Sequence, residues 1–273
     1  MNDVYELVRV FDKNNEAEGN FAAIFSGEQK SDELSAFTEV SINIKNQHNI
    51  ATTCFIRKII DERYVVRCFN SENEIQCCGH GMIAAAKVIF LKYDLDEINL
   101  NGNLISFAKG YQGEKNKVSL MLPRILSHIQ NIPDWIGDSI SFNGDKIQPS
   151  HSAISDKDDG YLLFEFEPAL SLDRFSSLQL DLKQVCMSTK RAVVLLQFEE
   201  KKKHLYLRYF APQYGVLEDA ATGSVMRFVA DYIEKKYKCS RFDVSQCSYQ
   251  GGFMKVECKK EKIIITANVT IET

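Results

Sequence analysis

The sequence predicts an α+β fold with a duplicated organisation. Short segments rich in β-branched and aromatic residues recur along the 273 residues, which is typical of many short strands. Two principal segments have the length and apolar content of a buried helix, at 81–92 and 224–236. Each of them follows an aromatic-rich strand, a loop and a glycine-containing turn. The repetition predicts two copies of one structural unit.

The two turns, at 76–81 and 217–224, are the candidate functional elements. The first N–H groups of a helix lack intrahelical partners and lie at the positive end of its dipole, so they attract anions. We expect two facing helix N-termini, one holding a substrate carboxylate and the other stabilising developing negative charge. The alternative is that both turns are plain connections. An arginine precedes each turn glycine at a similar distance: Arg67 before Gly81, and Arg208 before Gly223.

The first half contains most of the predicted strands. Alternating or β-branched segments predict strands at 5–11, 19–25, 52–56, 63–69, 98–100, 104–107 and 118–122. A helix over 33–46 has Ser31 or Asp32 as its candidate N-cap. Pro123 ends this series and is followed by turn or helix signals up to residue 140, so we divide the chain there.

In the second half, strands are predicted at 161–166, 192–198, 205–210, 253–258 and 262–271. The domains are therefore 1–123 and 124–261, with a C-terminal strand at about 262–273 that returns to the first domain.

Composition excludes several classes of function. The formal net charge of -4 and the absence of a basic stripe do not fit a nucleic-acid-binding protein. No apolar run reaches the ~18 residues that a membrane span requires, and the first residues are unlike a signal peptide. The eight cysteines form no Cys-x-x-Cys pair, so we expect reduced thiols, no metal site and a cytoplasmic protein.

Four motifs carry a family resemblance: Gly19-Asn20, the segment from Glu74 to His80, Phe210-Ala211-Pro212, and 215–224 with the sequence GVLEDAATGS. With them the chain resembles the PhzF-like family of phenazine-biosynthesis isomerases, which have a diaminopimelate epimerase-like fold. The resemblance implies two similar domains, each a barrel-like mixed sheet around a central helix, with the active-site cleft between them. It further implies cofactor-independent proton transfer on a small carboxylic acid, isomerisation or epimerisation, and a homodimer.

The resemblance also assigns site residues by position. His80 and Asp219 correspond to catalytic residues, so either of them is a candidate to move the proton. The expected substrate-binding residues are Asn20, Thr52, Cys78, Gly79, Gly81, Thr222, Gly223 and Ser224. The alternative role for His80 or Asp219 is to cap the helix that follows it. A mechanism with two thiol bases is excluded, because the position we match to Cys78 in the second half is Ala220.

The chain departs from the family pattern at the proton carrier. Thr52 stands where the family has a glutamate, and a hydroxyl cannot replace a carboxylate as a general base near neutral pH. Phe21, Ala220, 70–71 and 251–253 also differ from the family motifs. Two functions follow: an isomerase or epimerase that uses Asp219 or His80, or a catalytically silent protein that binds a small acid or acts as a scaffold. A module unrelated to small molecules is disfavoured by the intact second turn.

Overall fold

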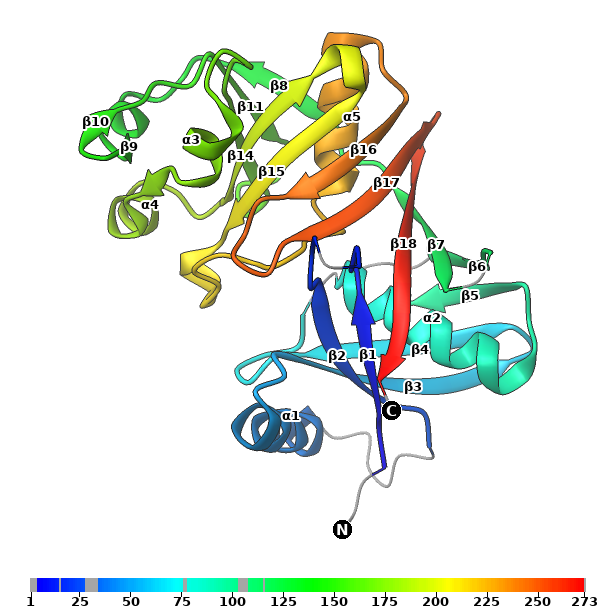
Figure 1. Cartoon of the computed structure of the whole chain (residues 1–273). Helices are drawn as coiled ribbons and strands as arrows, with labels where there is room; N and C mark the ends of the chain where they lie inside the picture. The colour runs from blue at the N-terminus through cyan, green and yellow to red at the C-terminus, as the bar shows by residue number, and fades with distance from the viewer. Residues whose placement is uncertain are drawn as a thin grey trace. The chain divides into compact units, whose positions relative to one another are not determined.

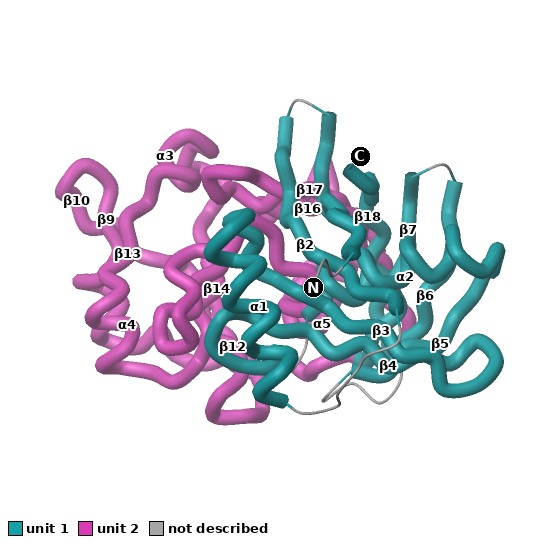
Figure 2. The backbone as a smooth tube through the Cα atoms, turned by 90° about the horizontal axis from the view of Figure 1, so that it is seen from below, with its two compact units in different colours: residues 1–123, 262–273 teal, residues 124–261 magenta. Residues whose placement is uncertain are grey.

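The computed structural model describes residues 4–14, 16–27, 34–75, 78–102, 108–114 and 116–272. The chain divides into two compact units, shown in teal and magenta in Figure 2. Unit 1 comprises Met1–Pro123 and Lys262–Thr273, and unit 2 comprises Arg124–Glu261.

Unit 1 is a closed barrel of eight strands. They are β1 (Glu6–Val10), β2 (Asn20–Phe25), β3 (Thr52–Ile60), β4 (Arg63–Phe69), β5 (Glu97–Asn101), β6 (Ala108–Gln112), β7 (Lys117–Pro123) and β18 (Lys262–Glu272). Each of β1 to β6 pairs with the next strand, β7 pairs with β18, and β18 pairs back with β1, which closes the ring. The β2–β3 and β4–β5 pairs are parallel and the others antiparallel, so the sheet is mixed.

The barrel of unit 1 encloses helix α2 (Gly79–Tyr93). It packs against β1, β2, β3, β4, β6, β7 and β18, and most of its side chains are buried. Helix α1 (Leu34–His48) instead lies beside β3 and β4, as Figure 1 shows. There Phe37 contacts Phe55 and Phe69, with ring centroids 4.4 and 5.4 Å away. A helix as apolar as α2 is stable only when most of its surface is covered, and the barrel provides that cover.

Unit 2 repeats the arrangement around helix α5 (Met226–Tyr237). Its sheet runs in the order β17 (Gly252–Lys259), β16 (Arg241–Gln246), β15 (His204–Phe210), β14 (Ala192–Glu199), β12 (Tyr161–Glu165), β11 (His151–Ser155) and β8 (Ser127–Gln130). Helix α5 packs against β17 and β8.

Smaller elements complete unit 2. They are β9 (Ile140–Phe142), β10 (Asp145–Lys146), β13 (Gln179–Leu180), α3 (Leu172–Ser176), α4 (Leu182–Ser188), and the 3-10 helices η1 (Asp134–Asp138), η2 (Glu200–Lys202) and η3 (Pro212–Tyr214).

The duplication predicted from the turns is present in the strand pairing of both units. In unit 1, β2 and β3 are parallel, β3 and β4 antiparallel, β4 and β5 parallel, and β5 and β6 antiparallel. Unit 2 has the same succession through β12, β14, β15, β16 and β17. The registers also match, because Thr53 faces Phe69 in unit 1 as Val193 faces Phe210 in unit 2.

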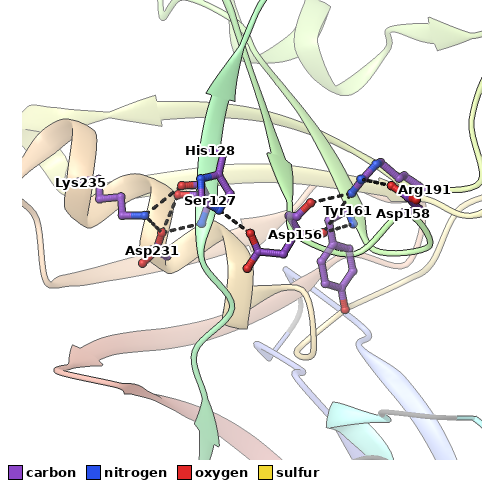
Figure 3. A network of polar contacts seen from close by, with 9 residues as sticks. Ser127, His128, Asp156, Asp158, Tyr161, Arg191, Asp231 and Lys235 are labelled. Atoms are coloured by element: carbon purple, nitrogen blue, oxygen red, sulfur yellow. Dashed lines mark hydrogen bonds and ion pairs between the residues drawn. The ribbon is translucent and has the colours of Figure 1, made fainter.

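A buried carboxylate fixes α5 to strand β8. Asp231 accepts hydrogen bonds from Ser127 N at 2.8 Å and Ser127 Oγ at 2.6 Å, and Lys235 Nζ lies 2.7 Å away (Figure 3). Burial alone raises the pKa of Asp231, but the hydrogen bonds from Lys235 and Ser127 outweigh it and lower this pKa overall. Asp231 is therefore ionised at neutral pH and holds the first strand of unit 2 against the central helix.

The α+β prediction and the barrel-like sheets implied by the resemblance are confirmed. The starts of both central helices differ from the prediction: α2 begins at Gly79, and α5 begins at Met226 because the preceding residues form a tighter turn, with Met226 N bonded to Gly223 O. Strands β6, β8, β9, β10, β11, β13 and β16 and helices α3 and α4 were not predicted, since all of them are short. The proposed cap at Ser31 or Asp32 and the strand at 104–107 lie outside the described residues.

We predict that Gly81→Ala destabilises the protein by about 1–3 kcal/mol, the range for overpacking a filled core. A Cβ atom at Gly81 would lie 2.6 Å from Cys54 Sγ, 2.9 Å from Cys68 Sγ and 3.0 Å from Cys78 Sγ. The free energy of unfolding in urea measures the effect. Gly27→Ala is the control, since nothing lies within 4 Å of its Cβ position. Equal stability of the Gly81 variant and the parent protein would contradict this packing argument.

Candidate functional site

The first turn places the start of α2 at one end of the unit 1 barrel. Cys78 is the N-cap residue, and its carbonyl accepts the first helical hydrogen bond from Met82 N at 3.0 Å. Gly79, His80 and Gly81 form the first helical turn, where backbone N–H groups have no intrahelical acceptor. Residues 76 and 77 of the predicted turn lie outside the described part of the chain.

Asn20 and Thr52 lie at this same end of the barrel. Both are the first residues of their strands, and β2 and β3 run parallel with Ala22 opposite Thr52. Strand β4 runs antiparallel to β3 and ends at Phe69, opposite Thr53, so the loop to α2 also leaves from this end. Thr52 is buried at 4% exposure, and it shares a strand face with Cys54, which packs against Gly81. Thr52 is therefore directed toward the start of α2.

Three buried thiols surround the first turn. Cys54 Sγ lies 3.1 Å from Cys68 Sγ across the β3–β4 pair, and Cys78 Sγ lies 3.6 Å from His80 Nδ1. A hydrogen bond to Cys68, together with burial, raises the pKa of the Cys78 thiol well above its ordinary value. Burial likewise raises the pKa of Cys54. Cys78 is thus a neutral thiol at physiological pH, and packing is the role this environment supports.

The second turn holds a carboxylate in a fixed position. Thr222 Oγ1 donates a 2.5 Å hydrogen bond to Asp219 Oδ2. Gln246 holds the same two residues through the backbone, because its Nε2 donates to Asp219 O at 2.6 Å and its Oε1 accepts from Thr222 N at 2.7 Å. Ser248 Oγ adds a 2.7 Å bond to Ala220 O. The turn between Asp219 and Thr222 is therefore restrained on both sides.

Gly223 and Ser224 lead directly into α5. Both are buried, and Gly223 O accepts a 3.1 Å hydrogen bond from Met226 N, which tightens the entry into the helix. Arg227 N and Phe228 N likewise donate to Ser224 O and Val225 O, so the N–H groups of the first turn of α5, unlike those at the start of α2, are bonded to the carbonyls just before the helix.

Neither catalytic candidate is the N-cap of its helix. The N-cap of α2 is Cys78 and that of α5 is Val225, and neither makes a side-chain capping hydrogen bond. His80 is the second residue of α2 and is half-buried. Asp219 lies seven residues before Met226, and its carboxylate accepts from Thr222 instead. Neither side chain therefore occupies the N-cap position of its helix.

Sequence reasoning missed Gln246, which is 2% exposed at the end of β16. A signal was present, because Phe242 and Val244 are the apolar residues of an alternating strand and Gln246 continues their face. A glutamine on the core side of a strand must find hydrogen-bond partners. Which partners it finds depends on β16 and the second turn meeting in space.

The family model for phenazine biosynthesis-like proteins, PhzC-PhzF, matches residues 8–271. The chain belongs to the PhzC-PhzF family. A Vibrio cholerae relative in the curated set, named as an uncharacterized isomerase, is 28% identical over 212 residues, covering 78% of this chain and 70% of the relative.

Solved structures share the PhzC-PhzF fold. A PhzF-family protein from Enterococcus faecalis has a TM-score of 0.83 at 20% identity, covering 98% of this chain and 96% of that one. A hydroxyproline epimerase from Agrobacterium vitis, solved with trans-4-hydroxy-L-proline, has a TM-score of 0.60 at 9% identity, covering 100% and 92%. At these identities the likeness concerns the fold.

Two searches of the described residues bear on other kinds of site. Within them, no group of three or more His, Cys, Asp or Glu side chains is arranged to hold a metal ion. Of the helices in the described ranges, none is long and apolar enough to cross a membrane.

We predict that thiol labelling with iodoacetamide at pH 8 modifies Cys186 at least tenfold faster than Cys78. Only the thiolate reacts, and the raised pKa of Cys78 keeps it protonated until well above pH 9, whereas Cys186 is exposed. Peptide mass spectrometry after timed quenching gives both rates, with urea-unfolded protein as the control in which the rates converge. Equal rates in the native protein would mean that Cys78 is an accessible thiolate.

Proposed function

We propose that this protein is a cofactor-independent isomerase or epimerase that transfers a proton on a small carboxylic acid. The observation that carries the proposal is the restrained carboxylate of Asp219, held by Thr222 and Gln246 just before the start of a buried helix. The isomerase name of the Vibrio cholerae relative and the fold shared with a hydroxyproline epimerase support the same reaction class.

In this proposal the helix starts bind the substrate. The first-turn N–H groups at Gly79 and Gly81, and those at Gly223 and Ser224, donate to carboxylate oxygens or to the oxyanion that develops as a proton leaves carbon. The donors at Gly79 and Gly81 belong to buried helix α2, and those at Gly223 and Ser224 belong to the buried turn before α5, so little reorganisation accompanies the proposed reaction. The Ser224 hydroxyl and Asn20 are further polar groups for the substrate.

The proton carrier is Asp219 or His80. Asp219 supplies a carboxylate in a fixed position, which a general base requires. His80 supplies an imidazole beside the neutral Cys78 thiol, at a helix start where N–H groups are directed toward the substrate. Cys78 is not a base in this scheme, because its raised pKa keeps the thiol protonated. Each turn thus contributes one ionisable side chain that could carry the proton: His80 in the first turn and Asp219 in the second.

One observation favours a second candidate function. Thr52 occupies the family's glutamate position, buried at 4% exposure and on the face of β3 that packs against α2. A protein that lost this carboxylate can retain the anion-binding turns and bind a small acid without turning it over. The homodimer, the cytoplasmic location and the absence of a cofactor remain predictions from the sequence.

Deuterium incorporation tests the proposal. The protein is incubated in D2O with a panel of amino acids, including proline and trans-4-hydroxy-L-proline, and with trans-2,3-dihydro-3-hydroxyanthranilate, and exchange is followed by NMR. Exchange or isomerisation that depends on the protein supports the enzyme. Thermal shifts on the panel without any exchange support the silent binder.

We predict that Asp219→Asn lowers deuterium exchange on any active panel member by at least 100-fold, the lower range for loss of a general base. The amide keeps an acceptor for Thr222 Oγ1, so the turn is retained and only the base is lost. Asp158→Asn is the control, because Asp158 is exposed in the same unit. Unchanged exchange in the Asp219 variant would assign the proton transfer to another group, with His80→Asn as the next variant.

We predict that Thr52→Glu increases or creates exchange activity if the chain descends from an enzyme that used a glutamate there. The variant restores a carboxylate beside the start of α2, at a cost in stability because Thr52 is buried. Thr52→Gln is the matched control for size without the ionisable group. Exchange in the glutamate variant no higher than in the glutamine variant would exclude this position as a proton carrier here.

A further inference from the structure

The same ion pair precedes both helix starts. In unit 1, Arg67 Nε and Nη2 lie 3.0 and 2.7 Å from the two carboxylate oxygens of Glu74. In unit 2, Arg208 Nε and Nη2 lie 2.7 and 2.9 Å from those of Glu218. Both are two-pronged arginine–carboxylate pairs, the strongest and most directional kind.

Each guanidinium also lies over the phenylalanine two residues further along its strand. The distance from Arg67 Cζ to the Phe69 ring centroid is 5.2 Å, and that from Arg208 Cζ to the Phe210 centroid is 5.0 Å. The aromatic ring restricts the orientation of the guanidinium group. Both the arginine–glutamate pair and the phenylalanine under it are thus repeated in the two units.

The backbone around the two pairs has the same register. Ile75 N donates to Cys68 O at 2.7 Å in unit 1, and Asp219 N donates to Tyr209 O at 3.0 Å in unit 2. In each unit, therefore, the residue after the glutamate bonds to the residue after the arginine. Seven positions separate Arg67 from Glu74 and ten separate Arg208 from Glu218, so the pair restores one geometry after loops of different length.

With this register, each residue of the first turn can be aligned with one residue of the second. Glu74 and Glu218 each stand five positions before a glycine, so Gly79 corresponds to Gly223, whereas the arginine spacing alone would pair Gly81 with Gly223. His80 then corresponds to Ser224, Cys78 to Thr222, and Ile75 to Asp219. The second unit still offers no thiol at the Cys78 position.

We propose that Arg67–Glu74 and Arg208–Glu218 are positioning pairs that hold the N–H groups of the two helix starts in their anion-binding arrangement. The proposal rests on the proposed function and adds residues that act through the turns without contacting the substrate. The pair and its phenylalanine are shared by the units, whereas other flanking side chains differ, as Cys68 differs from Tyr209 and Ile75 from Asp219. The shared pair is the feature that we expect both turns to depend on.

Partial burial makes the pairs sensitive to the loss of one partner. The side-chain exposure is 27% for Arg67 and 12% for Glu74, and 10% for Arg208 and 26% for Glu218. Removing a carboxylate takes the ionic partner from a largely buried guanidinium, which is more disruptive than breaking an exposed pair. The loop end at the glutamate is then free to move, and the turn five residues later moves with it.

Amide hydrogen exchange measured by mass spectrometry tests the proposal without any substrate. Glu218→Gln is expected to raise exchange in peptides covering 219–226 at least tenfold and to leave peptides from β14 unchanged, and Glu74→Gln is expected to do the same for 78–82. Glu257→Gln and Glu97→Gln are matched controls, since each breaks an exposed ion pair in the same unit. A change of less than twofold in both turns of correctly folded variants would overturn the proposal.

Charge exchange provides the rescue. The Arg67→Glu/Glu74→Arg double variant is expected to recover at least half of the protection lost in Glu74→Gln, because the pair re-forms with its ends exchanged. If Glu218→Gln unfolds globally, Arg208→Lys replaces it, since lysine keeps the charge but loses the two-pronged contact. Increased exchange spread evenly over unit 2 in Arg208→Lys would mean that the pair supports the fold in general, and would also overturn the proposal.

Benzoate serves as the carboxylate probe in the second arm. Its titration into 15N-labelled protein is followed through the amide signals of Gly79, Gly81, Gly223 and Ser224. Affinity at least tenfold weaker in Glu218→Gln than in Glu257→Gln supports positioning, and equal affinity opposes it. If benzoate leaves the parent protein's amide signals unchanged, the anion-binding part of the proposed function fails. The amide hydrogen exchange experiment then tests by itself whether the two ion pairs position the turns.

Discussion

Burial of one apolar helix inside a curved sheet is the constraint on which each unit depends. A 15-residue helix such as α2 is marginal in water by itself, so its stability comes from the strands that cover it. Inside that cover every backbone polar group must be bonded, and the helix satisfies its own except in its first and last turns. The unmatched N–H groups are thus confined to the barrel end, where the strand-to-helix turn is located. The fold and the anion binding that we propose therefore have one physical origin.

The two units surround their helix starts with different side chains. Around the first turn, Cys54, Cys68 and Cys78 form an apolar, tightly packed surrounding in which a thiolate is disfavoured. Around the second turn the environment is polar: Thr222 donates to Asp219, and Gln246 of strand β16 accepts from Thr222 N. Duplicated backbones therefore carry unlike side chains at matching positions.

Arginine–glutamate pairs connect the shared fold to the divergent turns. Strands β4 and β15 end at the same register, yet the loops that follow differ by three residues, so the chain needs a fixed point before it enters each helix. A two-pronged charge pair supplies that point because its geometry is directional. The loops between the paired residues are then free to vary in sequence and length without moving the turns.

The sequence by itself determined the α+β class, the duplication and, to within two residues, the position of both helix starts, because periodicity and glycine turns are local signals. Through its motifs it also indicated the family, which the family model over residues 8–271 confirms, and it predicts that Thr52 stands in place of a family glutamate. Tertiary structure decided which residues restrain the turns. Gln246 and the partners of Arg67 and Arg208 follow from strands and loops that meet only after folding, and the pKa of Cys78 follows from the burial and thiol neighbours that folding creates. Hydrogen bonds and desolvation depend on distances in space, which spacing along the chain does not contain.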